Sequence, residues 1–157
     1  MPEEKDVTIR EALPADCPVL VELICELAQY EKLTHEVRVD AQTLHESLFG
    51  TRPFAYALLA ETEGAIVGFC LYFYNFSTFL GRPGIYIEDI FVREPYRARG
   101  IGSLFFSHLR TIAQKQQCGR IEWWVLDWNT PAIEFYRRLG AEPMSEWTVW
   151  RLGRDKL

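Results

Sequence analysis

Basic residues are in deficit in this 157-residue chain: 17 lysines and arginines face 22 aspartates and glutamates, for a formal net charge of −5. Proteins that bind a nucleic-acid duplex usually present a basic face to its phosphates, so we expect no nucleic-acid partner. Long apolar runs are also lacking, because the longest, over residues 66–74, falls far short of the roughly 20 residues that span a bilayer. Residues 1–7 are charged, which argues against a signal peptide. These absences predict a cytoplasmic protein with no membrane partner.

Metal-ligand spacing is absent too. The chain has four cysteines and three histidines, and no two cysteines form a CxxC pair. The histidines form no ligand-spaced cluster with them. We therefore expect no metal, and we interpret the cysteines as free, buried or partly buried thiols in a reducing compartment. They are Cys17, Cys25, Cys70 and Cys118.

No linker, repeat or low-complexity tract divides the sequence, so residues 1–157 are predicted to form a single domain. A first strand is expected over residues 7–10. Apolar residues at helical spacing then predict a helix with Asp16 as its N-cap and Pro18 in its first turn. A second helix over residues 41–49 is predicted to stop at Gly50.

After residue 54 the residues become those typical of strands. Glu63-Gly64 predicts a tight hairpin, and residues 81–84 predict a longer loop. The expected strands of this part of the chain lie at residues 56–61, 66–74, 85–92, 120–126, 142–144 and 147–152.

Two further helices are expected, one over residues 101–117 and one that Pro131 opens and Gly140 ends. The element order is therefore β-α-α-β-β-β-α-β-α-β-β. Hairpin-linked strands imply antiparallel pairing, and the strand-helix-strand unit implies one parallel pair. The sequence predicts an α/β fold with a mixed sheet and helices on both faces.

The most informative segment leaves an apolar strand, turns at Pro95 and enters a helix through Gly100 and Gly102. Glycines let the backbone approach a ligand closely, and a helix start offers unpaired N–H groups to an anion. Arg97 and Arg99 add positive charge suited to a pyrophosphate. A dinucleotide fingerprint, GxGxxG, would need a third glycine where Phe105 stands, and no Gly-Lys-Ser/Thr tripeptide of a P-loop occurs.

The segment Arg97-Ala98-Arg99-Gly100-Ile101-Gly102 resembles the acetyl-CoA-binding motif of the GNAT N-acetyltransferases. Residues 126–129 and 133–141 are similar to that family's Asn…FYxxxG segment. Residues 27–31, 86–92 and 127–129 look like the diamine and thialysine N-acetyltransferases within it. The resemblance implies a GNAT fold with a partly splayed sheet, acetyl-CoA as co-substrate, direct transfer in a ternary complex and a homodimer.

The resemblance also assigns residues to the co-substrate in three groups. Along the pantetheine arm it implies Ile90, Phe91 and Val92, with backbone N–H groups of the last two facing the oxyanion. At the pyrophosphate it implies Arg97, Ala98, Arg99, Gly100, Ile101, Gly102 and Ser103. On the other side it implies Asn129, Thr130, Pro131 and Ala132. Asn129 is equally typical of a simple helix N-cap.

Amine acetylation has two proton problems, and two residues are candidates for them. An alkylammonium with a pKa of about 10 is only ~0.1% neutral at pH 7, so a base that receives its proton is useful. Glu88, which interrupts an apolar strand, matches the family's base-linked glutamate; the alternative is a carboxylate that pairs with an arginine. Tyr136 matches the family's general acid and would stabilise the leaving thiolate; the alternative is a core tyrosine at helical spacing.

For the acceptor, the resemblance implies contacts from Tyr30, Glu31, Glu88, Glu122, Trp123 and Trp124. Carboxylates attract an ammonium, and a tryptophan can pack on one. Neighbouring strand residues face opposite ways, so at most one of the two tryptophans is expected in the pocket. Thr148 stands where polyamine acetylases of the subgroup place a glutamate, which disfavours long polyamines. A lysine analogue such as thialysine, or a short diamine, is the predicted acceptor.

Two alternatives stay open. The acceptor amine could belong to a protein, a peptide or an aminoglycoside instead of a small cation. A module that binds acyl-CoA without catalysis would keep the loop from Arg97 to Gly102 but would have no need of Glu88 and Tyr136 together.

Overall fold

The computed structural model describes residues 6–157, so the first five residues of the predicted charged N-terminus lie outside it. The described chain forms two compact units, one up to Trp124 and one over Val125–Leu157. Within residues 6–157, no helix is long and apolar enough to cross a membrane.

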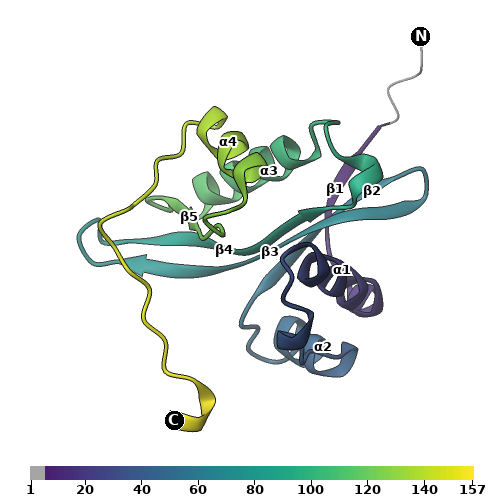
Figure 1. The fold of residues 1–157 in the computed structure, drawn as a ribbon, viewed down its shortest axis with the longest axis horizontal. Helices are drawn as coiled ribbons and strands as arrows, with labels where there is room; N and C mark the ends of the chain where they lie inside the picture. Colours follow the sequence, from purple (N-terminus) through teal and green to yellow (C-terminus); the bar gives the residue numbers. More distant parts are fainter. Residues whose placement is uncertain (1–5) are drawn as a thin grey trace. The chain divides into compact units, whose positions relative to one another are not determined.

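A five-stranded sheet is the centre of the first unit, with the strands in the order β1-β2-β3-β4-β5 (Figure 1). The first four strands pair antiparallel with their neighbours, and β4 pairs parallel with β5. This confirms the predicted mixed sheet, which is open at both edges. The strands are β1 (Thr8–Glu11), β2 (Tyr56–Thr62), β3 (Ala65–Ser77), β4 (Arg82–Val92) and β5 (Ile121–Trp123).

Helices cover both faces of this sheet, as predicted (Figure 1). On one face lie α1 (Cys17–Tyr30) and α2 (Ala41–Phe49), and on the other lies α3 (Ile101–Lys115). Leu20 and Leu23 of α1 are fully buried in a core with Phe69 of β3. Short 3-10 turns occur at Pro14–Asp16, Thr34–Glu36 and Glu94–Tyr96.

Local signals account for several element ends. The Asp40 side chain accepts a hydrogen bond from the Thr43 backbone N–H at 2.8 Å and so caps α2, which ends before Gly50 as predicted. Glu63 and Gly64 both have positive φ, 55° and 74°, which fits the tight turn predicted between β2 and β3. Asp16 occupies the predicted N-cap position of α1, with Pro18 in the first turn. Its carboxylate, however, binds Arg10 and the Leu13 N–H and makes no cap hydrogen bond to the helix.

The predicted loop over residues 81–84 is wrong in its position. Arg82, Pro83 and Gly84 already belong to β4, and the turn falls before them at Gly81, whose φ is 63°. Pro83 is tolerated at this strand start, where its carbonyl still accepts a hydrogen bond from Gly119 at 2.9 Å. A proline was therefore interpreted as a loop residue where it begins a strand.

The second unit contains one α-helix, α4 (Thr130–Arg138), and a 3-10 turn at Arg154–Lys156. Asn129 caps α4 by accepting a hydrogen bond from Ala132 N–H at 3.4 Å, and Gly140 follows the helix with a φ of 88°. The capping interpretation of Asn129 and the predicted start and end of this helix are confirmed.

The predicted strands over residues 142–144 and 147–152 are absent from the described chain. Trp147 is 78% exposed and Trp150 is 92% exposed. A strand is stabilised by pairing with a neighbour, and within residues 6–157 this segment has none. Its β-forming residues are therefore not sufficient to make strands.

The strand predicted over residues 120–126 is shortened to Ile121–Trp123. Its pairing with β4 ends where Trp123 lies opposite Ile87, one residue before an irregularity in β4. Beyond that point the two strands no longer form a ladder, so the sheet is splayed there, as the resemblance implied.

Candidate active site

A β-bulge in β4 places Glu88. Leu71 of β3 lies opposite Asp89, and Tyr72, the next residue, lies opposite Ile87, so Glu88 is the extra residue of the pair. Its side chain is exposed, although β4 is otherwise largely apolar. A bulge bends the strand that carries it and re-aims its side chains, and bulges are frequent beside active sites. The predicted base therefore sits at the irregular point of the strand.

The edge of β4 from Glu88 to Val92 is open on the side of β5. The β4–β5 ladder within residues 6–157 comprises only the pairs from Ile85 with Ile121 to Ile87 with Trp123. An open strand edge presents unpaired N–H and C=O groups that an extended amide-containing molecule can bind like a further strand. Ile90, Phe91 and Val92, predicted to contact the pantetheine arm, lie on this edge.

The loop that follows β4 is tied to its surroundings by Arg93. The Arg93 guanidinium pairs with Glu26 of α1 at 2.9 Å and donates to the backbone oxygen of Ile66 at 2.9 Å. Ala98 and Gly100 both have left-handed backbone conformations, with φ of 61° and 77°, and α3 begins at Ile101. The loop therefore turns sharply just before α3, whose first N–H groups have no partner within the helix and are available to an anion.

The two loop arginines lie over aromatic rings. The guanidinium carbon of Arg97 is 4.9 Å from the ring centre of Tyr30 and 5.5 Å from that of Phe91, and its Nε donates to Val92 O at 2.9 Å. Arg99 lies 5.2 Å from the ring centre of Tyr96. Arg97 thus contacts Tyr30, which was predicted to bind the acceptor, and also Phe91 and Val92, which were predicted to bind the co-substrate. Ser103 is exposed and Gly102 partly so in the first turn of α3.

Acidic groups gather near the bulge. Asp89 is half-buried, and burial, with smaller contributions from the charges of Glu88 and Glu31, raises its pKa to about 7. Burial also raises the pKa of Glu31. Asp89 was not among the predicted site residues, although two adjacent carboxylates in an apolar strand are an available signal. An ammonium at this point would relieve the mutual repulsion of the three carboxylates.

The raised pKa of Asp89 predicts a pH-dependent stability. The folded state holds this proton more tightly than the unfolded chain, whose aspartates titrate near 3.8. The stability that the neutral group contributes is therefore lost as the pH rises toward 7 and changes little above it. We expect the free energy of unfolding of the wild type to fall by about 2–3 kcal/mol between about pH 5 and pH 8 because of this group. In Asp89→Asn this fall should be absent. Urea unfolding at both pH values measures it.

Glu46→Gln is the matched control for this experiment, because Glu46 is exposed on α2 and should leave the pH dependence as it is. If wild type and Asp89→Asn lose stability in parallel over this pH range, Asp89 is not the group responsible.

The two tryptophans of the β5 region face opposite ways. Trp123 packs against Phe106 of α3 with ring centres 5.0 Å apart. Trp124 is 60% exposed and packs edge-on against Tyr86 at 5.8 Å. Glu122, which lies opposite Tyr86 in the ladder, pairs with Arg120 at 3.0 Å. Only Trp124 is thus on the face of Tyr86, and Trp123 belongs to the packing of α3.

In the second unit, Tyr136 lies in α4 and is partly buried. Its ring packs against Phe135 at 5.7 Å, and its carbonyl accepts a hydrogen bond from Ala141 at the helix end. Thr130, Pro131 and Ala132 form the first turn of α4 behind the Asn129 cap, with Asn129 itself 9% exposed.

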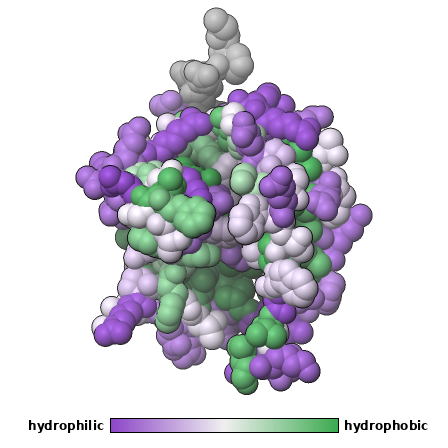
Figure 2. Space-filling model, turned by 90° about the vertical axis from the view of Figure 1, so that its left-hand side faces the viewer, coloured by the Kyte–Doolittle hydropathy of each residue, from purple (hydrophilic) through white to green (hydrophobic). Residues whose placement is uncertain are grey.

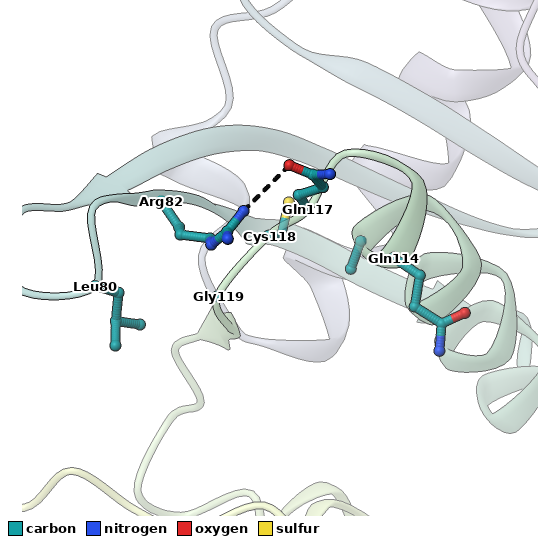
Figure 3. Close-up of a pocket in the computed structure, with 7 residues that line it drawn as sticks. Leu80, Arg82, Gln114, Gln117, Cys118 and Gly119 are labelled. Carbon is teal, nitrogen blue, oxygen red and sulfur yellow. Dashed lines mark hydrogen bonds between the residues drawn. The ribbon is translucent and has the colours of Figure 1, made fainter.

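A surface cavity of about 480 Å³ lies at the other end of α3 from the loop (Figure 3). Arg82 and Gln117, which are hydrogen-bonded at 3.2 Å, form part of its wall with Leu80 and Cys118. The 15 residues of α3 span about 22 Å, so this cavity is remote from Gly100. It is not the site that the sequence predicted.

Apolar side chains are exposed at the end of the β3–β4 hairpin. Phe76 is 62% exposed, and Phe79 is fully exposed. Figure 2 views the molecule from the side on which this hairpin end lies in Figure 1, and hydrophobic surface is visible there among hydrophilic side chains. Large exposed apolar groups of this kind often mark a contact with another chain.

A mixed sheet splayed at a bulge, with an anion-binding loop entering the next helix, is the arrangement of an acetyltransferase of the GNAT family. The chain belongs to this family: its profile, Acetyltransferase (GNAT) family, matches residues 18–141. The chain is therefore an N-acetyltransferase, and the family uses acetyl-CoA as co-substrate. The resemblance noted in the sequence is confirmed.

Two curated proteins and one solved structure are similar to the chain over most of its length. The chain is 39% identical over 156 residues to the thialysine N-epsilon-acetyltransferase of Bos taurus, covering 94% of this chain and 91% of that protein. It is 34% identical over 194 residues to the L-ornithine N5-acetyltransferase NATA1 of Arabidopsis thaliana, covering 95% and 85%. A solved integron cassette protein from V. cholerae superposes with a TM-score of 0.79 at 26% identity, covering 96% and 94%.

Proposed function

We propose that this protein transfers the acetyl group of acetyl-CoA to the side-chain amine of a small cationic amino acid, such as thialysine or ornithine. The observation that carries the proposal is the bulge at Glu88, which sets carboxylates beside the open edge of β4. Two relatives named for thialysine and ornithine support this acceptor class. A short diamine is the next candidate, and Thr148 in place of a glutamate disfavours long polyamines.

The residues present fit acetyl-CoA. Ile90, Phe91 and Val92 would pair with the pantetheine amides along the open edge of β4, and the loop from Arg97 to Ser103 would hold the pyrophosphate. Asn129, Thr130, Pro131 and Ala132 would contact it from α4. When bound, the thioester supplies the acetyl group.

The protein's own task is to manage protons. Glu88 accepts the proton that the ammonium must lose, directly or through a water molecule, and Asp89 and Glu31 hold the cation close to it. Tyr136 donates a hydrogen bond to the sulfur as the thiolate leaves. Proton transfer from a phenol with a pKa of about 10 to a thiolate, whose thiol has a pKa of about 8.5, is uphill by roughly 2 kcal/mol. A strong hydrogen bond to the sulfur therefore suffices. No acyl-enzyme is needed, and transfer takes place in a ternary complex.

We further propose that residues 1–157 act as one acetyltransferase domain, since the family profile spans both compact units. The protein is proposed to act in the cytoplasm as a homodimer. Exposed apolar groups at the β3–β4 hairpin and at Trp147 and Trp150 support an interface between copies. Neither a nucleic acid nor a membrane is proposed as a partner.

An amine panel tests the acceptor. Purified protein with acetyl-CoA is assayed for thiol release against thialysine, ornithine, lysine, putrescine, spermidine, an aminoglycoside and a peptide. We expect thialysine and ornithine to have the highest kcat/KM. If only the peptide or the aminoglycoside is acetylated, the acceptor belongs to that alternative class and not to the small cationic amino acids. Binding of acetyl-CoA without turnover of any amine would favour a non-catalytic binding module.

A further inference from the structure

Two buried polar atoms lack partners on the face of the sheet that carries Trp124. The hydroxyl oxygen of Tyr86 and the side-chain oxygen Oδ1 of Asn75 are buried, and neither has a hydrogen-bond partner within residues 6–157. A buried polar group without a partner is costly and in native proteins usually marks a place where water or a ligand binds. Both atoms are therefore candidates for ligand contacts.

These two atoms flank an ion pair. The Nε of Arg120 lies 3.0 Å from Oε1 of Glu122, and Nδ2 of Asn75 donates to the same oxygen at 3.5 Å. Glu122 lies opposite Tyr86 in the ladder. Burial raises the pKa of Tyr86, and the charges of Glu88 and Glu122 raise it further. The pair is about one-third to one-half exposed, with side-chain exposures of 46% and 35%. A positive group, a negative group and two unsatisfied oxygens thus adjoin one another.

Ladder pairing puts this cluster on the face of the sheet covered by α1. Phe69 and Leu71 of β3 pack into the core beside α1, and alternation along β3 places Phe73 and Asn75 on the same face. The ring of Tyr86 contacts that of Phe73 at 5.0 Å, so Tyr86 is on this face too. Gly84 makes room for the Asn75 side chain, since a Cβ at Gly84 would lie 2.5 Å from Oδ1 of Asn75.

The distance to Glu88 matches the length of an amino-acid side chain. Tyr86 and Glu88 are two residues apart on β4, which is about 7 Å at a strand rise of 3.3 Å per residue. In thialysine and lysine the side-chain nitrogen is five bonds from the α-carbon, about 6 Å when extended. An acceptor with its side-chain amine at Glu88 therefore brings its α-carbon to the level of Tyr86 and Glu122.

We propose that Arg120, Glu122, Asn75 and Tyr86 form a clamp for the zwitterionic head group of the acceptor, which rests on the proposed function. Arg120 binds the α-carboxylate, and its planar guanidinium suits a carboxylate. Glu122, Oδ1 of Asn75 and the Tyr86 hydroxyl accept the three hydrogen bonds of the α-ammonium. The clamp selects a free amino acid over a diamine, because a diamine has no carboxylate and brings a second ammonium toward Arg120.

Matched acceptors test the clamp in the wild-type protein. Thialysine is compared with bis(2-aminoethyl) sulfide, and ornithine with putrescine; each pair differs only by the α-carboxylate. We expect the amino acid to have a kcat/KM roughly 10- to 100-fold above its partner, the range of one charge-assisted contact. Equal values would overturn the clamp and leave the acetyltransferase proposal standing. No turnover of any amine would remove the proposed function itself.

Arg120→Met separates recognition from structure. We expect it to lower kcat/KM for thialysine about 10-fold or more through KM, and to leave the diamine unchanged or improved, because Glu122 is then free to attract its distal ammonium. Arg110→Met, which removes an exposed arginine of α3, is the matched control. If kcat/KM falls by the same factor for thialysine and for the diamine, or falls for neither, the proposal is contradicted. Tyr86→Phe, which removes only the hydroxyl, should shift selectivity in the same direction.

Discussion

Glu88→Gln is expected to lower kcat/KM for thialysine at about pH 7 by 10²- to 10³-fold, the range of a lost general base. The ammonium form dominates at this pH, with only ~0.1% neutral amine, so the proton must have an acceptor. As the pH approaches the pKa of the amine, solution supplies the neutral form and the loss should shrink to less than about 10-fold. Thiol-release rates over this pH range measure both values.

Asp89→Asn is the informative comparison for this experiment, because Asp89 is the neighbouring carboxylate and has the raised pKa. Glu46→Gln on α2 controls for the loss of a remote charge. If Glu88→Gln keeps wild-type activity while Asp89→Asn loses it, the base is Asp89 and the assignment of Glu88 is wrong.

Tyr136→Phe is expected to lower kcat by about 10- to 100-fold, the worth of a hydrogen bond to a charged group. The ring and its packing on Phe135 remain, and only the hydroxyl that would stabilise the leaving thiolate is removed. The KM of the amine should change by less than about threefold, because the hydroxyl acts on the sulfur and not on the acceptor. Steady-state kinetics with varied thialysine separate the two constants.

Phe135→Leu is the matched control for Tyr136→Phe, because it disturbs the packing of the same helix and keeps the hydroxyl. If Tyr136→Phe keeps the wild-type kcat, or if its kcat falls no more than that of Phe135→Leu, Tyr136 is a core tyrosine without a catalytic role.

Local signals in the sequence were enough for the helices. The bounds of α2 follow from the Asp40 cap and from Gly50, which act within one turn of the helix. The start of α3 follows from glycines in the loop before it, and Gly140 marks the end of α4. These features depend on residues close together in the chain, so single-sequence reasoning reaches them.

Strand ends and register could not be predicted, because they depend on partners far away in the chain. Glu88 is a bulge residue only because Leu71 and Tyr72 take Asp89 and Ile87 as partners. Residues 147–152 are rich in β-formers, yet without a neighbouring strand in the described chain they remain unpaired. Propensity gives the tendency, and the partner decides the outcome.

The candidate site also contains residues that the sequence predicted and residues that it did not. Glu88 and the loop glycines were found from a motif that is continuous in sequence. Glu122 was predicted from the resemblance, but its neighbours Asn75 and Tyr86 were missed, because Asn75 and Glu122 are 47 residues apart and meet only across three strands. Asp89 was missed since its burial, which raises its pKa, is a property of the packed sheet.

The most direct test of the account is the product formed when the protein, acetyl-CoA and thialysine are mixed. Mass spectrometry and NMR of the amino acid report whether it has gained one acetyl group and on which nitrogen, and thiol release reports the co-substrate consumed. We expect one acetyl group on the side-chain nitrogen for each thiol released, and none on the α-nitrogen. Acetylation of the α-nitrogen, or no acetylation of thialysine, ornithine or a short diamine, would contradict it.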